Sequence, residues 1–167
     1  MIQSRDENEV LATVAASTGR RLLGLVSLGL LGVLLIYIAF VQPPELVWQA
    51  FLIAVGCAAL WMADAMRRAT ASVVELTPLG LRDGDGTVIA PLDDIVGMDR
   101  GFFAFKPSNG FLLKLRRGAW GTRMWRPGLW WRMGGRIGIG GMTPGSQTKF
   151  MSDVLAAMLA ERENPQG

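Results

Sequence analysis

The sequence lacks the residues that most enzyme active sites use. It contains no histidine and a single cysteine, Cys57, among its 167 residues. A Ser-His-Asp triad, a Cys-His pair, a His/Cys zinc site and a dithiol redox pair are therefore excluded. Composition leaves only carboxylate, lysine or tyrosine chemistry open, and we expect no enzyme activity, no metal and no cofactor.

Charged residues are also scarce, whereas hydrophobic residues are abundant. Asp, Glu, Lys and Arg make up 19% of the chain and hydrophobic residues 50%. The length fits one domain of ordinary size. So apolar and so weakly charged a chain is typical of a protein that lies partly in lipid.

Two long stretches carry no charge at all. They cover residues 22–41 and 46–63, and only Gln-Pro-Pro-Glu at 42–45 separates them. As helices rising about 1.5 Å per residue, both match a bilayer core of about 30 Å. The two prolines end one helix and begin the next. We therefore predict a transmembrane helical hairpin over residues 22–66.

A cleavable signal peptide is the alternative for the first stretch. Its apolar region would be about 7 to 15 residues long and would begin near the start of the chain. Here twenty uncharged residues follow a mixed segment that includes Asp6, Glu7 and Glu9. These features favour a membrane span that is retained.

Basic residues flank the predicted hairpin on one side only. Arg20 and Arg21 precede it, Arg67 and Arg68 follow it, and its turn has no Lys or Arg. The positive-inside rule therefore places both termini in the cytoplasm, with residues 1–21 as a cytoplasmic tail. Neither uncharged stretch contains an ionisable site for a proton or ion path.

Small residues in both predicted spans allow close helix packing. They are Gly24, Gly29 and Gly32 in the first span and Ala50, Ala54 and Ala58 in the second. We expect these surfaces to join the two helices of one hairpin, and a dimer seam is the alternative. Cys57 is expected to be a small buried residue of the second helix.

From residue 70 onward, short apolar segments alternate with Gly, Pro, Asp and Asn. This pattern predicts an antiparallel β domain over residues 70–163, with a tight hairpin at the glycine-rich turn 83–86. Further strands are expected over residues 92–100, 102–106 and 111–116.

The end of the chain has a helical period instead. Apolar residues recur at helical spacing over residues 146–162, and we predict an amphipathic helix there that covers one end or face of the sheet. Its apolar stripe comprises Phe150, Met151, Val154, Leu155, Met158 and Leu159. The predicted fold class is α+β: a transmembrane hairpin followed by an antiparallel β-barrel or sandwich capped by this helix.

Two segments of the β domain resemble a known family. L-T-P-L-G-L-R at residues 76–82 and V-I-A-P-L-D-D-I at 88–95, after a membrane hairpin, are similar to the bacterial membrane-anchored PH-like domain proteins. The chain departs from that family at Leu92, where a Trp is common, and in the long segment 120–145. The resemblance covers residues 22–116 and the final helix. It implies a PH-like barrel plugged by that helix, a bacterial inner membrane location, and a scaffold or binding role in processes such as membrane protein assembly.

Acidic residues are absent from residues 100–152, although this tract holds ten of the seventeen basic residues. All fourteen acidic residues lie outside it, so the net charge of +3 hides a strongly polarised chain. Within the tract, residues 120–133 interleave four Trp, two Met and three Arg. Trp favours the lipid headgroup region, and each Arg near an anionic leaflet contributes about 1 kcal/mol.

We therefore expect this basic, Trp-rich surface to engage anionic lipid headgroups or a membrane-protein partner. Its predicted contact residues are Arg116, Arg117, Trp120, Arg123, Trp125, Arg126, Trp130, Trp131, Arg132 and Arg136. One alternative places the Trp side chains inside the β domain with Arg on its solvated face, since strands alternate in this way. Another is a protein partner, because Trp, Arg and Met are favoured contact residues.

Two other functions fit parts of the sequence. Interleaved Arg and aromatic residues also suit a nucleic-acid groove, but a membrane anchor argues against nucleic acid as a partner. Asp93 and Asp94 invite an acid/base role, yet neighbours on a strand point to opposite faces. The sequence thus predicts a non-catalytic inner-membrane scaffold or binding protein. The alternative is an accessory or assembly subunit of a larger membrane complex.

Overall fold

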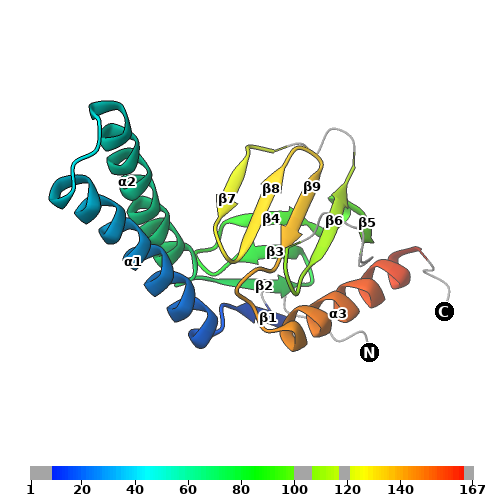
Figure 1. The fold of residues 1–167 in the computed structure, drawn as a ribbon. Helices are drawn as coiled ribbons and strands as arrows, with labels where there is room; N and C mark the ends of the chain where they lie inside the picture. Colours follow the sequence, from blue (N-terminus) through cyan, green and yellow to red (C-terminus); the bar gives the residue numbers. More distant parts are fainter. Residues whose placement is uncertain (1–8, 100–106, 117–120, 164–167) are drawn as a thin grey trace.

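The computed structural model describes residues 9–99, 107–116 and 121–163. Two long helices, α1 (Thr18–Val41) and α2 (Leu46–Ala69), form a hairpin that projects from a domain of two antiparallel sheets (Figure 1). Both helices are long and apolar enough to cross a membrane. Only 11% of the most apolar window of each is buried, which is low for core helices of a soluble protein.

The two helices pack through small residues, as predicted, but the contact uses a different face of α2. A Cβ atom on Gly32 would lie 2.9 Å from the carbonyl oxygen of Gly56, and Ala59 is buried nearby along the same helix. The expected alanines Ala50, Ala54 and Ala58 are exposed instead, and so is Cys57. Gly29 has open space around it. The prediction for Cys57 and for the packing face of α2 was therefore wrong.

The first sheet includes a strand that precedes the hairpin. Its order is β1-β2-β3-β4. The strands are β1 (Ala12–Ala15), β2 (Val73–Thr77), β3 (Gly80–Asp83) and β4 (Val88–Pro91). Val14 pairs with Val74, and both are completely buried. Residues 12–15, which the sequence analysis assigned to the N-terminal tail, thus belong to the domain, and the hairpin is an insertion between two neighbouring strands.

The second sheet has the order β5-β6-β9-β8-β7. Its strands are β5 (Ile95–Asp99), β6 (Phe111–Leu115), β7 (Met124–Arg126), β8 (Trp130–Met133) and β9 (Arg136–Ile139). The segment 120–145, which the family resemblance left open, thus supplies three of the five strands. Leu92–Asp94 forms a short 3-10 helix rather than part of a strand. The strand expected over residues 102–106 lies outside the described residues.

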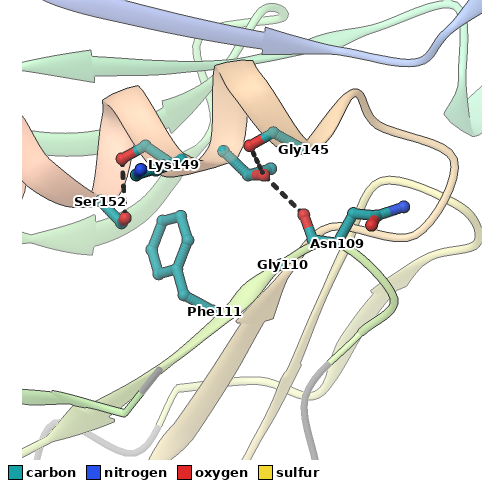
Figure 2. Close-up of a pocket in the computed structure, with 7 residues that line it drawn as sticks. Asn109, Gly110, Phe111, Gly145, Lys149 and Ser152 are labelled. Atoms are coloured by element: carbon teal, nitrogen blue, oxygen red, sulfur yellow. Dashed lines mark hydrogen bonds between the residues drawn. The ribbon is translucent and has the colours of Figure 1, made fainter. Parts of the chain in front are cut away.

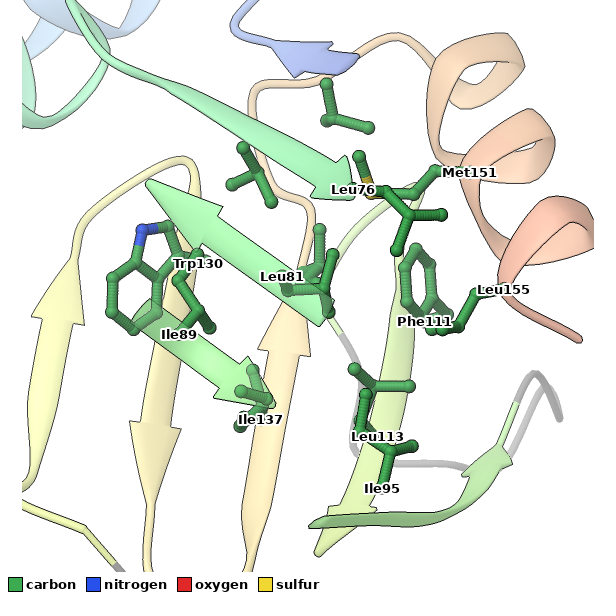
Figure 3. Close-up of a cluster of buried hydrophobic side chains, with 14 of the residues drawn as sticks. Leu76, Leu81, Ile89, Ile95, Phe111, Leu113, Trp130, Ile137, Met151 and Leu155 are labelled. Carbon is green, nitrogen blue, oxygen red and sulfur yellow. The ribbon is translucent and has the colours of Figure 1, made fainter. Parts of the chain in front are cut away.

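The core lies between the two sheets and the helix α3 (Gly145–Glu163), which packs against β1. Figure 3 shows Leu76 and Leu81 from the first sheet facing Phe111 and Leu113 from the second. Met151 and Leu155 of α3 are completely buried, and Val154, Met158 and Leu159 pack against the core. Phe150, which the helical stripe included, is 57% exposed. The turn at residues 84–87 joins β3 to β4, as the glycine pattern predicts.

Candidate functional site

The predicted basic, Trp-rich surface is divided between the two faces of the second sheet. Residues directly opposite each other in antiparallel strands point to the same face. Arg126 pairs with Trp130, and Trp130 pairs with the buried Ile139. These side chains therefore belong to the inner face. Trp131, next along β8, belongs to the outer face.

On the inner face, Trp130 is a core residue and not a surface contact. It is 1% exposed, and its indole Nε1 donates to the Asp83 carboxylate at 3.0 Å. Asp83 is also completely buried and lies at the end of β3. A buried carboxylate needs partners for its charge and lone pairs, and Trp130 supplies one of them. The expectation that Trp130 contacts lipid or a partner is therefore corrected.

Arg126 completes the same buried network. Its Nε lies 3.3 Å from Asp83 Oδ2, and its NH2 donates to Asp85 Oδ2 at 2.7 Å. Ser72, between α2 and β2, donates its hydroxyl to Asp83 as well. The hydrogen bonds that Asp85 accepts from Thr87, and the nearby Arg126 charge, lower the pKa of the Asp85 carboxyl. Arg126 therefore neutralises acidic residues of the first sheet and is not available as an unpaired cation.

Arg132 has a structural contact as well. It pairs with the buried Ile137, so it belongs to the inner face, and its NH1 donates to the carbonyl oxygen of Ile89 at 2.9 Å. A Cβ atom on Gly121 would lie 2.4 Å from Arg132 NH2, so the chain passes close to this guanidinium. This arginine thus connects β8 to β4 of the opposite sheet.

The outer face carries an aromatic row. Trp125 on β7 pairs with Trp131 on β8, which in turn pairs with Gly138 on β9. A Cβ atom on Gly138 would lie 2.4 Å from the indole of Trp131, so the missing side chain lets that ring lie over β9. Trp131 is half-buried, whereas Trp125 on the edge strand is 53% exposed. These two rings form the aromatic row.

A row of cations lies beside the aromatic row, two residues further along the strands. Arg136 pairs with Met133 on one side and with Lys114 on the other, so all three share the outer face. Arg123 precedes β7 by one residue and, by strand alternation, extends the same row. All four side chains are exposed. We call Arg123, Arg136 and Lys114 the cationic row, and Met133 lies within it. Among the described residues, the row has no acidic member, and Asp99 of β5 lies on the same face in line with the aromatic row.

The remaining predicted contact residues lie apart from both rows. Arg116 follows β6, is exposed, and donates its NH2 to the carbonyl oxygen of Asp93 at 2.6 Å. Arg117 and Trp120 lie outside the described residues. The structure therefore brings Arg123, Trp125 and Arg136 together as exposed residues. Sequence reasoning missed their neighbours Lys114 and Met133, which the alternation of β6 and β8 identifies.

The second sheet is attached to the hairpin through β7. The strand contacts α2, and in Figure 1 it is the strand of this sheet nearest to α2. The turn after β7 packs on the end of α2, because a Cβ atom on Gly128 would lie 3.1 Å from Thr70 Cγ2 and 3.6 Å from Met66 Cγ. From this turn, the strands of the second sheet extend toward the side of the domain from which the hairpin projects (Figure 1). The cationic row lies at their opposite end.

The acidic pair singled out in the sequence, Asp93 and Asp94, lies on the short 3-10 helix. Asp93 is exposed, and the backbone oxygen of its neighbour Asp94 accepts a hydrogen bond from the Arg116 amide. The described part of the chain has no group of three or more His, Cys, Asp or Glu residues placed to hold a metal ion. The buried Asp83 is held by its Trp, Arg and Ser partners.

A pocket at the start of α3 is lined by side chains whose polar atoms serve the fold (Figure 2). The Thr148 hydroxyl donates to the carbonyl oxygen of Asn109, and the Ser152 hydroxyl donates to that of Lys149. The Thr148 bond thus joins α3 to the turn before β6, whereas the Ser152 bond lies within α3. Figure 2 shows the Phe111 ring between α3 and the start of β6, beside these contacts.

Comparisons with protein-family models, with curated proteins and with solved structures find no match to this chain.

Proposed function

We propose that this protein is a non-catalytic, membrane-anchored binding protein. Its hairpin spans the membrane, and the outer face of the second sheet engages anionic lipid headgroups. The observation that carries the proposal is the cationic row beside the aromatic row, on strands attached to the hairpin through β7. Cations suit the anionic headgroups, and exposed tryptophan suits the interface below them.

The strand order supports a topology with both hairpin ends on one side of the membrane. β1 precedes the hairpin and β2 follows it, yet the two strands are neighbours in one sheet. Arg20, Arg21, Arg67 and Arg68 lie at these same ends. The positive-inside rule then favours the cytoplasm for the domain and for both termini.

The expected binding energy is modest, and the anchor makes it sufficient. Each cation close to an anionic leaflet contributes about 1 kcal/mol, and the effect fades within a Debye length of the surface. Arg123, Arg136 and Lys114 would therefore contribute about 3 kcal/mol together. Because the hairpin holds the domain at the membrane, this energy orients the domain and need not recruit it from solution.

The proposal includes a PH-like fold, with which the architecture agrees, and a bacterial inner membrane location, which rests on the sequence resemblance alone. Two antiparallel sheets face each other over one core, and a C-terminal helix packs against that core. The described chain adds β1 to this plan from before the hairpin.

Hydrogen–deuterium exchange on the full chain in lipid nanodiscs tests the proposal. Peptides that cover residues 121–136 should exchange more slowly in discs that contain phosphatidylglycerol than in discs of phosphatidylcholine alone. The variant Arg136→Glu should abolish the difference. Lys149→Glu, which reverses one exposed charge on α3, should leave it intact. Equal exchange of the unaltered chain in both lipids would rule out the lipid contact.

An accessory or assembly subunit of a membrane complex is the second candidate. The exposed Trp125 and Met133 favour it, because Trp and Met are enriched at protein contacts and β7 is an edge strand. Crosslinking in native membranes from a reactive group placed at position 133 distinguishes the two candidates. A crosslinked protein would indicate the subunit role, whereas crosslinks to lipid alone would support the first proposal.

A further inference from the structure

A groove of about 620 Å³ lies where the hairpin meets the β domain. Leu23, Gly24 and Ser27 of α1 form one wall, and Ser108 and Asn109 from the turn before β6 line the other. Arg20, Met66, Gly128, Gly141 and Met142 complete the lining. The groove is separate from the cationic row, with which it shares no residue.

A cation is fixed at the groove by bonds to the β domain. The NH1 group of Arg20 donates to the carbonyl oxygen of Thr143 at 3.0 Å. With its amide oriented to satisfy both partners, Asn109 also accepts from this guanidinium. These acceptors are neutral, so the bonds hold Arg20 in place without cancelling its charge. An anion at the groove therefore meets a positioned charge.

The α1 wall of the groove is uncharged and exposes the apolar side chain of Leu23. Leu23 is 70% exposed, and Gly24 lies where a Cβ atom would come within 2.6 Å of Met142 Cε and 3.0 Å of Met66 Cε. Both helices and the loop between β9 and α3 therefore converge on this glycine. If the hairpin spans the membrane, this wall lies in lipid one to two helical turns below Arg20.

We propose that the groove binds one anionic phospholipid, with its phosphate at Arg20 and an acyl chain along Leu23 and Ser27. A water-soluble phosphate would satisfy the cation but leave the apolar wall uncovered, whereas an amphipathic lipid satisfies both. The site rests on the membrane-spanning hairpin of the proposed function and is independent of the outer face of the second sheet. Its lipid is held between hairpin and domain and fixes their relative position.

Native mass spectrometry of the full chain, released from nanodiscs of phosphatidylcholine and phosphatidylglycerol, tests this site. The unaltered chain should retain one phosphatidylglycerol molecule. Ser27→Phe should fill the acyl path and reduce retention about tenfold. Leu30→Phe, on an exposed position of α1 outside the groove, should not change it. If both phenylalanine variants retain lipid equally, the acyl path is wrong.

Variants of the cation test the other half of the site. Arg20→Gln should remove the preference for phosphatidylglycerol over phosphatidylcholine, and Arg20→Lys should restore much of it. Lys149→Glu, which lies outside both the groove and the cationic row, should leave retention unchanged. Hydrogen exchange of residues 121–136 reports the outer surface separately, so a failure of the groove is distinguishable from a failure of that surface. Absence of retained lipid from the folded, unaltered chain would overturn the proposal. If inorganic phosphate in detergent stabilises the protein as much as phosphatidylglycerol does, the groove is an anion site that needs no lipid, which would also overturn the proposal.

Discussion

Asp83 is the residue on which the junction between the two sheets depends most. Its buried carboxylate accepts from Trp130 of the second sheet and from Ser72 next to the hairpin, and it pairs with Arg126. Nothing near Asp83 in the sequence indicates burial, because the residue opens a glycine-rich turn that is usually exposed. Its partners come from segments brought together only by the pairing of distant strands.

Removing this carboxylate should destabilise the domain. In Asp83→Ala, the buried Trp130 N–H loses its acceptor, and Arg126 keeps only Asp85. The expected loss is about 1–3 kcal/mol in the free energy of unfolding. Thermal melting of the full chain in mild detergent, followed by near-UV circular dichroism, measures the change. Asp93→Ala removes an exposed carboxylate and is the control. Equal melting of the two variants would show that the network does not stabilise the fold.

Gly138 provides a second test at the scale of one residue. Gly138→Ala places a methyl group where the Trp131 indole lies, so the ring should be displaced from β9. Gly97→Ala alters another glycine of the same sheet, which has open space around it. Tryptophan fluorescence should show greater solvent exposure in Gly138→Ala than in Gly97→Ala. Indistinguishable spectra would contradict the position given to Trp131.

Among the elements, those with a strong periodic signal were predicted, and β1 was missed. The two apolar helices and α3 agree with the sequence analysis to within a few residues, except that α2 continues to Ala69. β1 has four residues, and its partner β2 lies beyond the whole hairpin, so local sequence contains no signal of the pairing. The face on which α2 packs was also missed, because small residues occur on more than one of its faces.

The position of β1 predicts how the β domain can be isolated. Residues 70–163 alone lack β1 and expose the edge of β2 and the core around Val74. This fragment should aggregate or stay partly unfolded, since an uncovered apolar strand edge favours aggregation. Residues 9–17 joined to residue 70 by a short Gly/Ser linker should fold, because Ala15 and Val73 are already paired. Two-dimensional NMR of both fragments measures the difference, and a well-folded 70–163 would show β1 to be dispensable.

For the molecule as a whole, charge polarisation was predicted and its division between two faces was not. The acid-free tract of residues 100–152 contains both structural and exposed cations. The strands turn Arg126 and Arg132 toward the first sheet and leave Arg123 and Arg136 outside. The alternation that separates them follows from strand boundaries and register, which composition does not specify. The surface available for binding is therefore smaller than the tract.

The position of the cationic row relative to the bilayer tests the central claim most directly. The chain has one cysteine, so a spin label can be placed by Met133→Cys in a Cys57→Ala background, with Val88→Cys on the exposed surface of β4 as the matched site. Power-saturation electron paramagnetic resonance in nanodiscs compares collisions of each label with lipid-soluble oxygen and with a water-soluble nickel complex. With phosphatidylglycerol present, the label at 133 should lie at headgroup depth and the label at 88 in water. Arg123→Glu with Arg136→Glu should return the first label to water. A label at 133 that stays fully aqueous in anionic discs would contradict the account.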